Sequence, residues 1–154
     1  ESPVGFTFSH LLSKAQFTVT SDATDGYKHS VTGITVANFA TGTYTIDGGT
    51  WAGTTAKNFD FGSVVDVTAA SGAKTNATQV LLIPNTATFN VSFTVDLYKG
   101  TTKLGTQTKT IPVTTPLEAG HAYNFTIACK LGAEIKFTVE KQLGWADDQD
   151  ITVQ

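Results

Sequence analysis

Residues 117–145 read LEAGHAYNFTIACKLGAEIKFTVEKQLGW and carry the clearest structural signal of the chain. Apolar and polar residues alternate from Tyr123 to Leu131, and the alternation resumes from Ile135 to Val139 after a short link at 132–134. A period of two gives a strand one buried and one solvated face. Two such runs joined by a short glycine-containing loop predict an antiparallel hairpin. Because a hairpin of this length cannot bury its apolar face alone, we expect a second layer from the rest of the chain.

Alternating runs recur at regular spacing before this hairpin. The cleanest extends from Phe89 to Leu97, and lysine- and threonine-rich residues 103–113 predict an edge or solvent-facing strand after it. Further strands are expected at 31–39, 43–46 and 59–69, and a tight turn is expected at Gly48–Gly49. With about eight to ten short strands and glycine-rich turns, the sequence predicts one all-β domain over residues 1–154, an antiparallel two-sheet β-sandwich.

Three other segments give more specific expectations. The continuous apolar run 80–83, ended by Pro84, predicts a central strand covered on both faces. Residues 21–30 predict a polar loop with a turn at Asp25–Gly26. In residues 4–20 the alternation changes phase at 11–13, so we expect a long strand broken by a bulge or a single helical turn. Phe6, Phe8 and His10 share one phase, which predicts that His10 is a core histidine.

Composition excludes several function classes. Charged residues make up 15% of the chain, the net charge is −3, and all ten basic residues are lysine. Without arginine or a basic stripe, nucleic acid is not an expected partner. The sequence has neither a basic amphipathic segment nor an apolar run approaching the ~20 residues of a spanning helix. No signal peptide is present, and the chain begins Glu1-Ser2-Pro3 and lacks methionine, so we expect a processed product or an excised fragment.

No catalytic or cofactor motif appears. The chain has no Gly-x-Ser-x-Gly elbow and no phosphate-binding glycine loop. His10, His29 and His121 lie in three separate segments without the spacing of metal ligands. We therefore expect a non-enzymatic protein with no catalytic residue, no metal site and no cofactor.

A few residues remain candidates for other roles. Cys129 has no cysteine to pair with and shares the buried phase of its run, which predicts a buried free thiol. The acidic residues Asp147, Asp148 and Asp150 are interpreted as a solvated terminus, with cation binding left open. Tyr44, Trp51 and Trp145 are candidate sugar-stacking aromatics, although isolated aromatics in sandwiches more often pack in the core or at its rim. Matches to the Asn-x-Ser/Thr glycosylation motif occur at Asn76, Asn90 and Asn124, the last two inside expected strands.

Three segments together carry a family resemblance. They are Phe6-x-Phe8-x-His10-x-Leu12-Ser13-Lys14, then Leu81-Leu82-Ile83-Pro84, then Ala119-Gly120-His121-x-Tyr123-x-Phe125 followed by residues 135–145. Because these three segments follow one another in this order, the chain resembles the C-terminal domain of the fimbrillin-like surface lipoproteins of the Bacteroidales. Residues 140–144 depart from the family pattern, because a shorter Ile-x-x-Trp ending is expected before Trp145.

The resemblance implies a transthyretin-like Greek-key sandwich in a fimbrial subunit or adhesin at the cell surface or outer membrane. It implies other fimbrial subunits, or protein or glycan ligands on host or bacterial surfaces, as partners, and membrane attachment only through a lipid anchor on an N-terminal part that this chain lacks. It also implies assembly by strand donation. The opening strand and the terminal Ile151, Thr152 and Val153 are the candidate exchanging elements, because chain ends are free to exchange. A carbohydrate-binding module that uses Trp51 or Tyr44 is the alternative.

Overall fold

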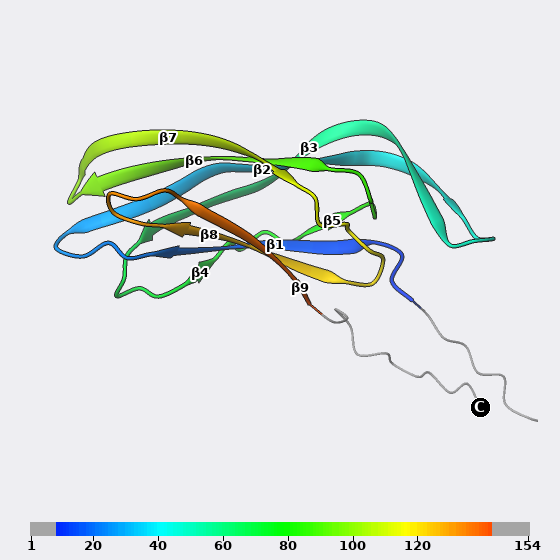
Figure 1. Cartoon of the computed structure of the whole chain (residues 1–154), viewed down its shortest axis with the longest axis horizontal. Helices are drawn as coiled ribbons and strands as arrows, with labels where there is room; N and C mark the ends of the chain where they lie inside the picture. The colour runs from blue at the N-terminus through cyan, green and yellow to red at the C-terminus, as the bar shows by residue number, and fades with distance from the viewer. Residues whose placement is uncertain (1–8, 143–154) are drawn as a thin grey trace, which may run out of the picture.

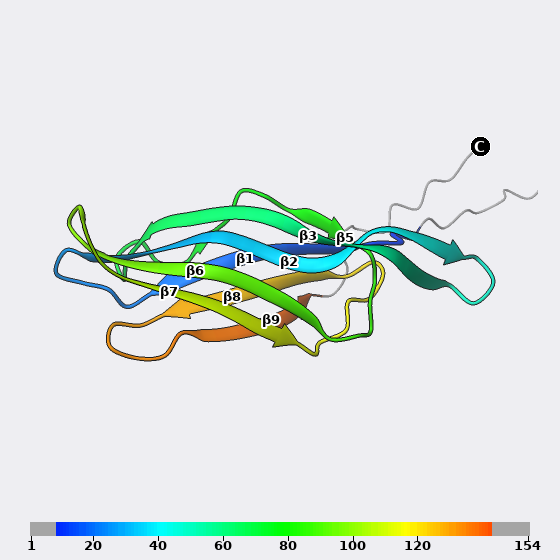
Figure 2. The same ribbon diagram turned by 90° about the horizontal axis from the view of Figure 1, so that it is seen from above.

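The computed structural model describes residues 9–142, which form two β-sheets packed face to face (Figures 1 and 2). The strands of this range are β1 (Ser13–Ser21), β2 (Tyr27–Thr45), β3 (Thr50–Val67), β4 (Lys74–Thr75), β5 (Val80–Leu82), β6 (Phe89–Lys99), β7 (Thr102–Val113), β8 (Ala122–Cys129) and β9 (Lys136–Gln142). One sheet has the order β3-β2-β6-β7; the other has the order β4-β1-β8-β9, with β5 also paired to β1. The expected β-sandwich is confirmed, and no helix of the described residues is long and apolar enough to cross a bilayer.

The hairpin predicted from the alternating runs 123–131 and 135–139 is β8–β9. Its strands are antiparallel, with Phe125 opposite Val139, as the alternation predicts. The partner of β8 on its other side is β1, and this pair is parallel, with Phe17 opposite Phe125. The two rings are stacked, with their centroids 5.0 Å apart. The sandwich is therefore antiparallel except at β1–β8, two strands that no tight turn connects.

The core lies between the sheets and follows the alternation of the strands. The inward residues of β6 are buried, as predicted from the run beginning at Phe89, and so are the inward residues of β1 and β8. The largest fully buried side chains are Tyr123, Phe17, Phe61, Phe93, Phe125, Ile34, Leu82, Leu117 and Ile127. Apolar residues of β9 are only partly buried against this core, because β9 is the last strand of its sheet.

The first part of the chain differs from the expectation. Strand β1 begins only at Ser13, and residues 9–12 belong to no strand. His10 is exposed, so the prediction of a core histidine is wrong. The phase argument fails because alternation has no meaning where the backbone is not a strand. Phe6 and Phe8 lie outside the described residues.

The apolar run 80–83 is not a central strand. Strand β5 has three residues and pairs only with the beginning of β1, at the edge of its sheet. Leu82 is buried but Leu81 is 47% exposed, so only one face of the run is covered. The outer edge of β1 is shared between β4 and β5, and between them the side-chain oxygen of Asn76 accepts a 2.8 Å hydrogen bond from the Phe17 amide. This division leaves no room for a longer strand.

Strands β2 and β3 are longer than the sequence indicates. The expected strands 31–39 and 43–46 form one strand, which also takes in residues 27–30 of the expected loop, so His29 is buried. The expected turns at Asp25–Gly26 and Gly48–Gly49 are confirmed. A bulge near Gly33, where φ is +59°, lets β2 continue past a position that interrupts the alternation.

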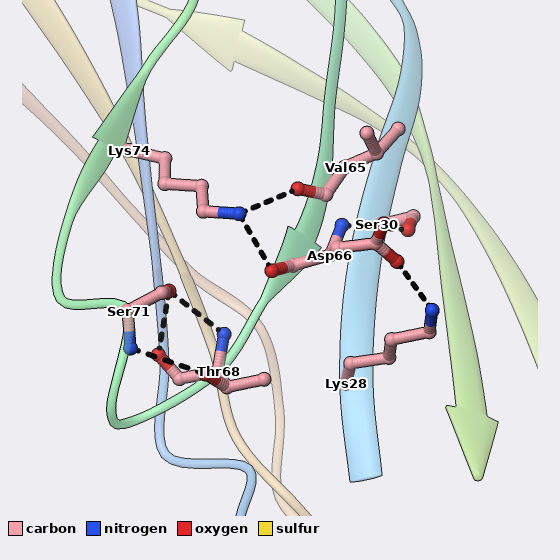
Figure 3. A network of polar contacts seen from close by, with 7 residues as sticks. All are labelled: Lys28, Ser30, Val65, Asp66, Thr68, Ser71 and Lys74. Carbon is pink, nitrogen blue, oxygen red and sulfur yellow. Dashed lines mark hydrogen bonds and ion pairs between the residues drawn. The ribbon is translucent and has the colours of Figure 1, made fainter. Parts of the chain in front are cut away.

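A polar network fixes the end of β3 (Figure 3). Asp66 has a φ of +54°, a left-handed conformation that aspartate tolerates better than most residues. Its carboxylate lies 2.6 Å from the Lys28 ammonium, while the Lys74 ammonium donates to the backbone oxygens of Val65 and Asp66 at 3.1 and 2.7 Å. Lys28 of β2 and Lys74 of β4 therefore stabilise the unfavourable backbone conformation at Asp66 from two sides.

Candidate functional site: a projecting hairpin and free strand edges

The most prominent feature outside the sandwich is the distal part of the β2–β3 hairpin. Pairing between β2 and β6 ends at Val36 opposite Val91, whereas pairing between β2 and β3 continues to Thr45 opposite Thr50. Residues 37–58 are therefore a two-stranded ribbon, which we refer to as the arm. Figures 1 and 2 show it extending past one end of the sandwich.

The arm is attached to the sandwich by side-chain hydrogen bonds. The Trp51 indole Nε1–H donates to the Leu11 carbonyl oxygen at 2.8 Å, and the Asn38 amide donates to the Ile83 carbonyl oxygen at 3.0 Å. An isolated two-stranded hairpin is at best marginally stable in water, so these attachments hold the arm in a defined position.

Glycine allows close packing across the ribbon. A Cβ added at Gly53 would lie 2.2 Å from the ring of Phe39 on the opposite strand, so the ring lies over the space that glycine leaves. A Cβ at Gly42, which is paired with Gly53, would lie 2.9 Å from the Ala52 carbonyl oxygen. The two glycines give this part of the arm a close backbone packing that other residues would disrupt.

The candidate aromatics Tyr44 and Trp51 are brought together on the arm. They are register partners on β2 and β3, with ring centroids 5.3 Å apart and planes tilted by 50°. Both side chains are half-buried, and the indole N–H of Trp51 is already used in the bond to Leu11. The pair combines a structural contact with two partly accessible ring surfaces, and its role in glycan binding remains a prediction.

Several strand edges lack a partner among the described strands. They are the outer edges of β3, β7 and β9, those of the short strands β4 and β5, and, beyond Val36, the edge of β2 that β6 no longer covers. The expected edge position of β7 is confirmed, and this strand carries Lys103 and Lys109. Charged residues protect edges against pairing with other chains. The arm segment Ala37–Thr45, ANFATGTYT, carries none over nine residues, whereas the free edge of β3 is uncharged only over the seven residues 50–56 before Lys57. The longer uncharged segment, Ala37–Thr45, is therefore the edge best suited to accept a strand.

The arm lies at the end of the domain where β1 begins and β9 ends. Leu11, just before β1, bonds to Trp51 of the arm, and Gln142 at the end of β9 pairs with Ala122 at the start of β8. Ala122 is opposite Lys14 in β1, which fixes all three segments at one end of the sandwich. The acidic and strand-exchange candidates and the third candidate aromatic lie outside the described residues: Trp145, Asp147, Asp148, Asp150, Ile151, Thr152 and Val153.

Sequence reasoning missed a pair of polar residues at the opposite end of β1. The Ser21 hydroxyl lies 2.8 Å from His29 Nδ1 and accepts a 3.0 Å hydrogen bond from the Ala23 amide. His29 is 5% exposed, and burial lowers its pKa, although the nearby Asp22 carboxylate opposes this effect. The signal available in the sequence was that Tyr27 and His29 continue the phase of Val31, which extends β2 into the expected loop.

Cys129 is a buried free thiol, as predicted. Burial raises its pKa to about 11, and the Asp22 carboxylate acts in the same direction. The thiol is therefore protonated at neutral pH and suited to packing rather than to nucleophilic chemistry. Within residues 9–142, no group of three potential metal ligands comes together.

Solved structures of known proteins share the fold of this chain. A fimbrial protein from Bacteroides vulgatus has 18% sequence identity and a TM-score of 0.62, covering 90% of this chain and 55% of that one. A putative cell adhesion protein from Bacteroides uniformis has 21% identity and a TM-score of 0.54, covering 90% and 52%. The chain thus spans about half the length of these solved structures, and a search of the curated proteins gives no match. Residues 1–141 match the fimbrillin-like family model, and the chain therefore belongs to the fimbrillin-like family.

Proposed function

We propose that this domain is part of a non-enzymatic fimbrial subunit or surface adhesin that assembles by strand donation. The observation that carries the proposal is the uncharged, unpaired edge Ala37–Thr45 of the arm, at the end of the domain where β1 begins and β9 ends. Membership of the fimbrillin-like family and the fold shared with a Bacteroides fimbrial protein support it. Exposure at the cell surface and contacts with other subunits or with surface ligands follow from the same proposal.

The donor in this proposal is the terminal segment containing Ile151, Thr152 and Val153. A strand added to the arm edge would satisfy backbone N–H and C=O groups that now face solvent, and alternate side chains of the donor would set specificity. The edge spans the nine residues Ala37–Thr45, which is longer than the donor segment of residues 150–154. Strand addition would also give the arm the third strand that an isolated ribbon lacks.

The test compares assembly of the native gene product, expressed in its own cells, with that of two variants. Deletion of 150–154 and Thr152→Pro should both abolish head-to-tail polymers seen by electron microscopy, because proline cannot donate to a strand ladder. The matched control, Thr152→Val, keeps β propensity and should polymerise normally. Polymers of parental length from the deletion variant would contradict strand donation by this segment.

The acceptor is tested separately with a peptide of residues 148–154. Binding of the peptide should protect backbone amides of Ala37–Thr45 from hydrogen exchange, while a scrambled peptide should not. Protection confined to β3, β7 or β9 would place the acceptor on another edge.

Glycan binding by the Tyr44–Trp51 pair is a second candidate. The adjacent, half-buried rings on the projecting arm favour it, because stacked aromatic surfaces are a common means of sugar recognition. In a Trp145→Phe background, which leaves Trp51 as the only tryptophan, glycans should quench the fluorescence. Tyr44→Ala should weaken this binding, and a flat titration over a broad glycan panel would argue against it.

A further inference from the structure

A crevice opens between the two sheets at the end of the domain opposite to the arm. Its volume is about 640 Å³, within the range of roughly 300–1,000 Å³ typical of small-molecule sites. Its walls come from β6, β7 and the β8–β9 turn, and His29 of β2 forms part of its lining. Gly105 of β7 leaves space here, because a Cβ added to it would meet no atom within 4 Å.

His29 contributes a buried polar group to this crevice. The Ser21 hydroxyl accepts from the Ala23 amide and lies within hydrogen-bond distance of His29 Nδ1. When the hydroxyl donates its hydrogen to Nδ1, the ring proton lies on Nε2, and this is the tautomer that binding of an anion requires. Within residues 9–142 the ring makes no other hydrogen bond, although it is only 5% exposed. A buried donor without an acceptor is uncommon in folded proteins and marks a position where a ligand oxygen would be favoured.

The rest of the lining combines an apolar surface with charged residues. Val95, Leu97 and Ile135 supply the apolar part, while Lys109, Lys130 and Glu134 supply the charges. The two ammonium groups of the lining outnumber its one carboxylate, which favours an anion over a cation, while the Asp22 carboxylate near His29 opposes an anion there. An anionic oxygen near Nε2 would accept a charge-assisted hydrogen bond, the strongest kind available to this group.

We propose that this crevice binds a carboxylate attached to an apolar body. The carboxylate would accept from His29 Nε2–H and lie near the lysines, and the apolar body would cover Val95, Leu97 and Ile135. Both a free aliphatic acid and the C-terminus of a peptide ending in apolar residues have this chemistry. The site is separate from the arm and does not depend on strand donation.

Binding is tested on the full chain with octanoate, with octanol as the uncharged ligand of the same length. Octanoate should bind at least tenfold more tightly in calorimetry, and backbone NMR shifts should concentrate at residues 105–109 and 130–135. N-acetyl-leucyl-leucine should bind and its C-terminal amide should not, because only the former has the carboxylate. Tighter binding of N-acetyl-leucyl-leucine than of octanoate would indicate a peptide C-terminus as the ligand, and the reverse order would indicate a free aliphatic acid. Equal affinities for octanoate and octanol, or shifts spread over the surface, would overturn the proposal.

Variants distinguish binding at a specific site from non-specific attraction to surface lysines. His29→Phe keeps an aromatic ring but removes the donor, and it should weaken octanoate binding about tenfold. Lys130→Gln should weaken it severalfold, whereas Lys136→Gln, an exposed lysine outside the lining, should leave it unchanged. Equal losses in the two lysine variants would refute a specific site even if His29→Phe does not fold.

Discussion

The indole nitrogen of Trp51 donates a 2.8 Å hydrogen bond to the carbonyl oxygen of Leu11, a residue forty positions earlier in the chain. This bond joins the arm to the segment that precedes β1. It makes the position of the arm dependent on the conformation of residues 9–12, at the end of the domain where we propose that strands are exchanged. The contact therefore links the free edge of β2 to the start of the domain.

Removing this bond should loosen the arm without unfolding the sandwich. In Trp51→Phe the ring remains but the donor is lost, so the free energy of opening the arm should fall by about 1 kcal/mol. Hydrogen exchange of amides in residues 37–58 measures this change. Tyr44→Phe, which keeps the neighbouring ring, is the control and should exchange as the parent does. Unchanged exchange in Trp51→Phe would show that the arm is held by other contacts.

The packing of Phe39 over Gly53 predicts that replacing glycine by alanine destabilises the protein at this position but not at an open one. Gly53→Ala would place a Cβ 2.2 Å from the Phe39 ring, and the required shift should cost about 1–3 kcal/mol. Gly105→Ala is the matched control, because its Cβ would meet no atom within 4 Å and should change stability by about 0.5 kcal/mol or less. Thermal or urea unfolding measures both, and equal effects would contradict the packing argument.

Asn76 should be a major determinant of stability despite its polar side chain. Its amide accepts from the Phe17 N–H at 2.8 Å and donates to the Phe61 carbonyl oxygen at 3.0 Å, in a buried position. Asn76→Ala leaves both backbone groups without this partner, so we expect a loss of about 3 kcal/mol in the free energy of unfolding. Asn90→Ala, at an exposed position of β6, serves as the control in urea unfolding. A loss below about 1 kcal/mol for Asn76→Ala would mean that water replaces the amide.

Stability should depend on pH through His29. Burial lowers the pKa of His29 in the folded state, so below about pH 6.5 the unfolded chain binds the proton more readily. The contribution of neutral His29 to the free energy of unfolding is therefore fully present above the pKa of His29 in the unfolded chain. It is lost as the pH falls toward the lower pKa of His29 in the folded protein. Urea unfolding between pH 8 and 5 should show this decline, and His29→Gln should reduce the slope. An equal slope in the variant would assign the decline to other groups.

The thiol of Cys129 should react only when the protein opens. Burial raises its pKa to about 11, so at pH 8 the reactive thiolate is scarce and also shielded. Labelling with Ellman's reagent should be slow in the native protein and fast in urea, measured by absorbance. Rapid labelling under native conditions would show that β8 opens locally.

The sequence determined those parts of the fold that depend on local alternation. The runs around Phe93 and Phe125 predict β6 and β8 because a period of two places every second side chain on the same face. The same pattern predicts the buried thiol of Cys129, and the lysine- and threonine-rich composition of residues 103–113 predicts the edge position of β7. These predictions use the pattern and composition of each strand by itself, without the identity of its neighbour.

Tertiary structure decided everything that depends on the choice of neighbours. Only the packed sheets show that the apolar run at Leu81 is a short edge strand, that His10 is exposed and that β1 pairs in parallel with β8. The free edge of the arm likewise arises because pairing with β6 ends before pairing with β3, and the crevice is lined by residues from segments far apart in the sequence. Alternation fixes which face of a strand is apolar, but strand partners and their register come from contacts between distant segments, and a local pattern does not contain them.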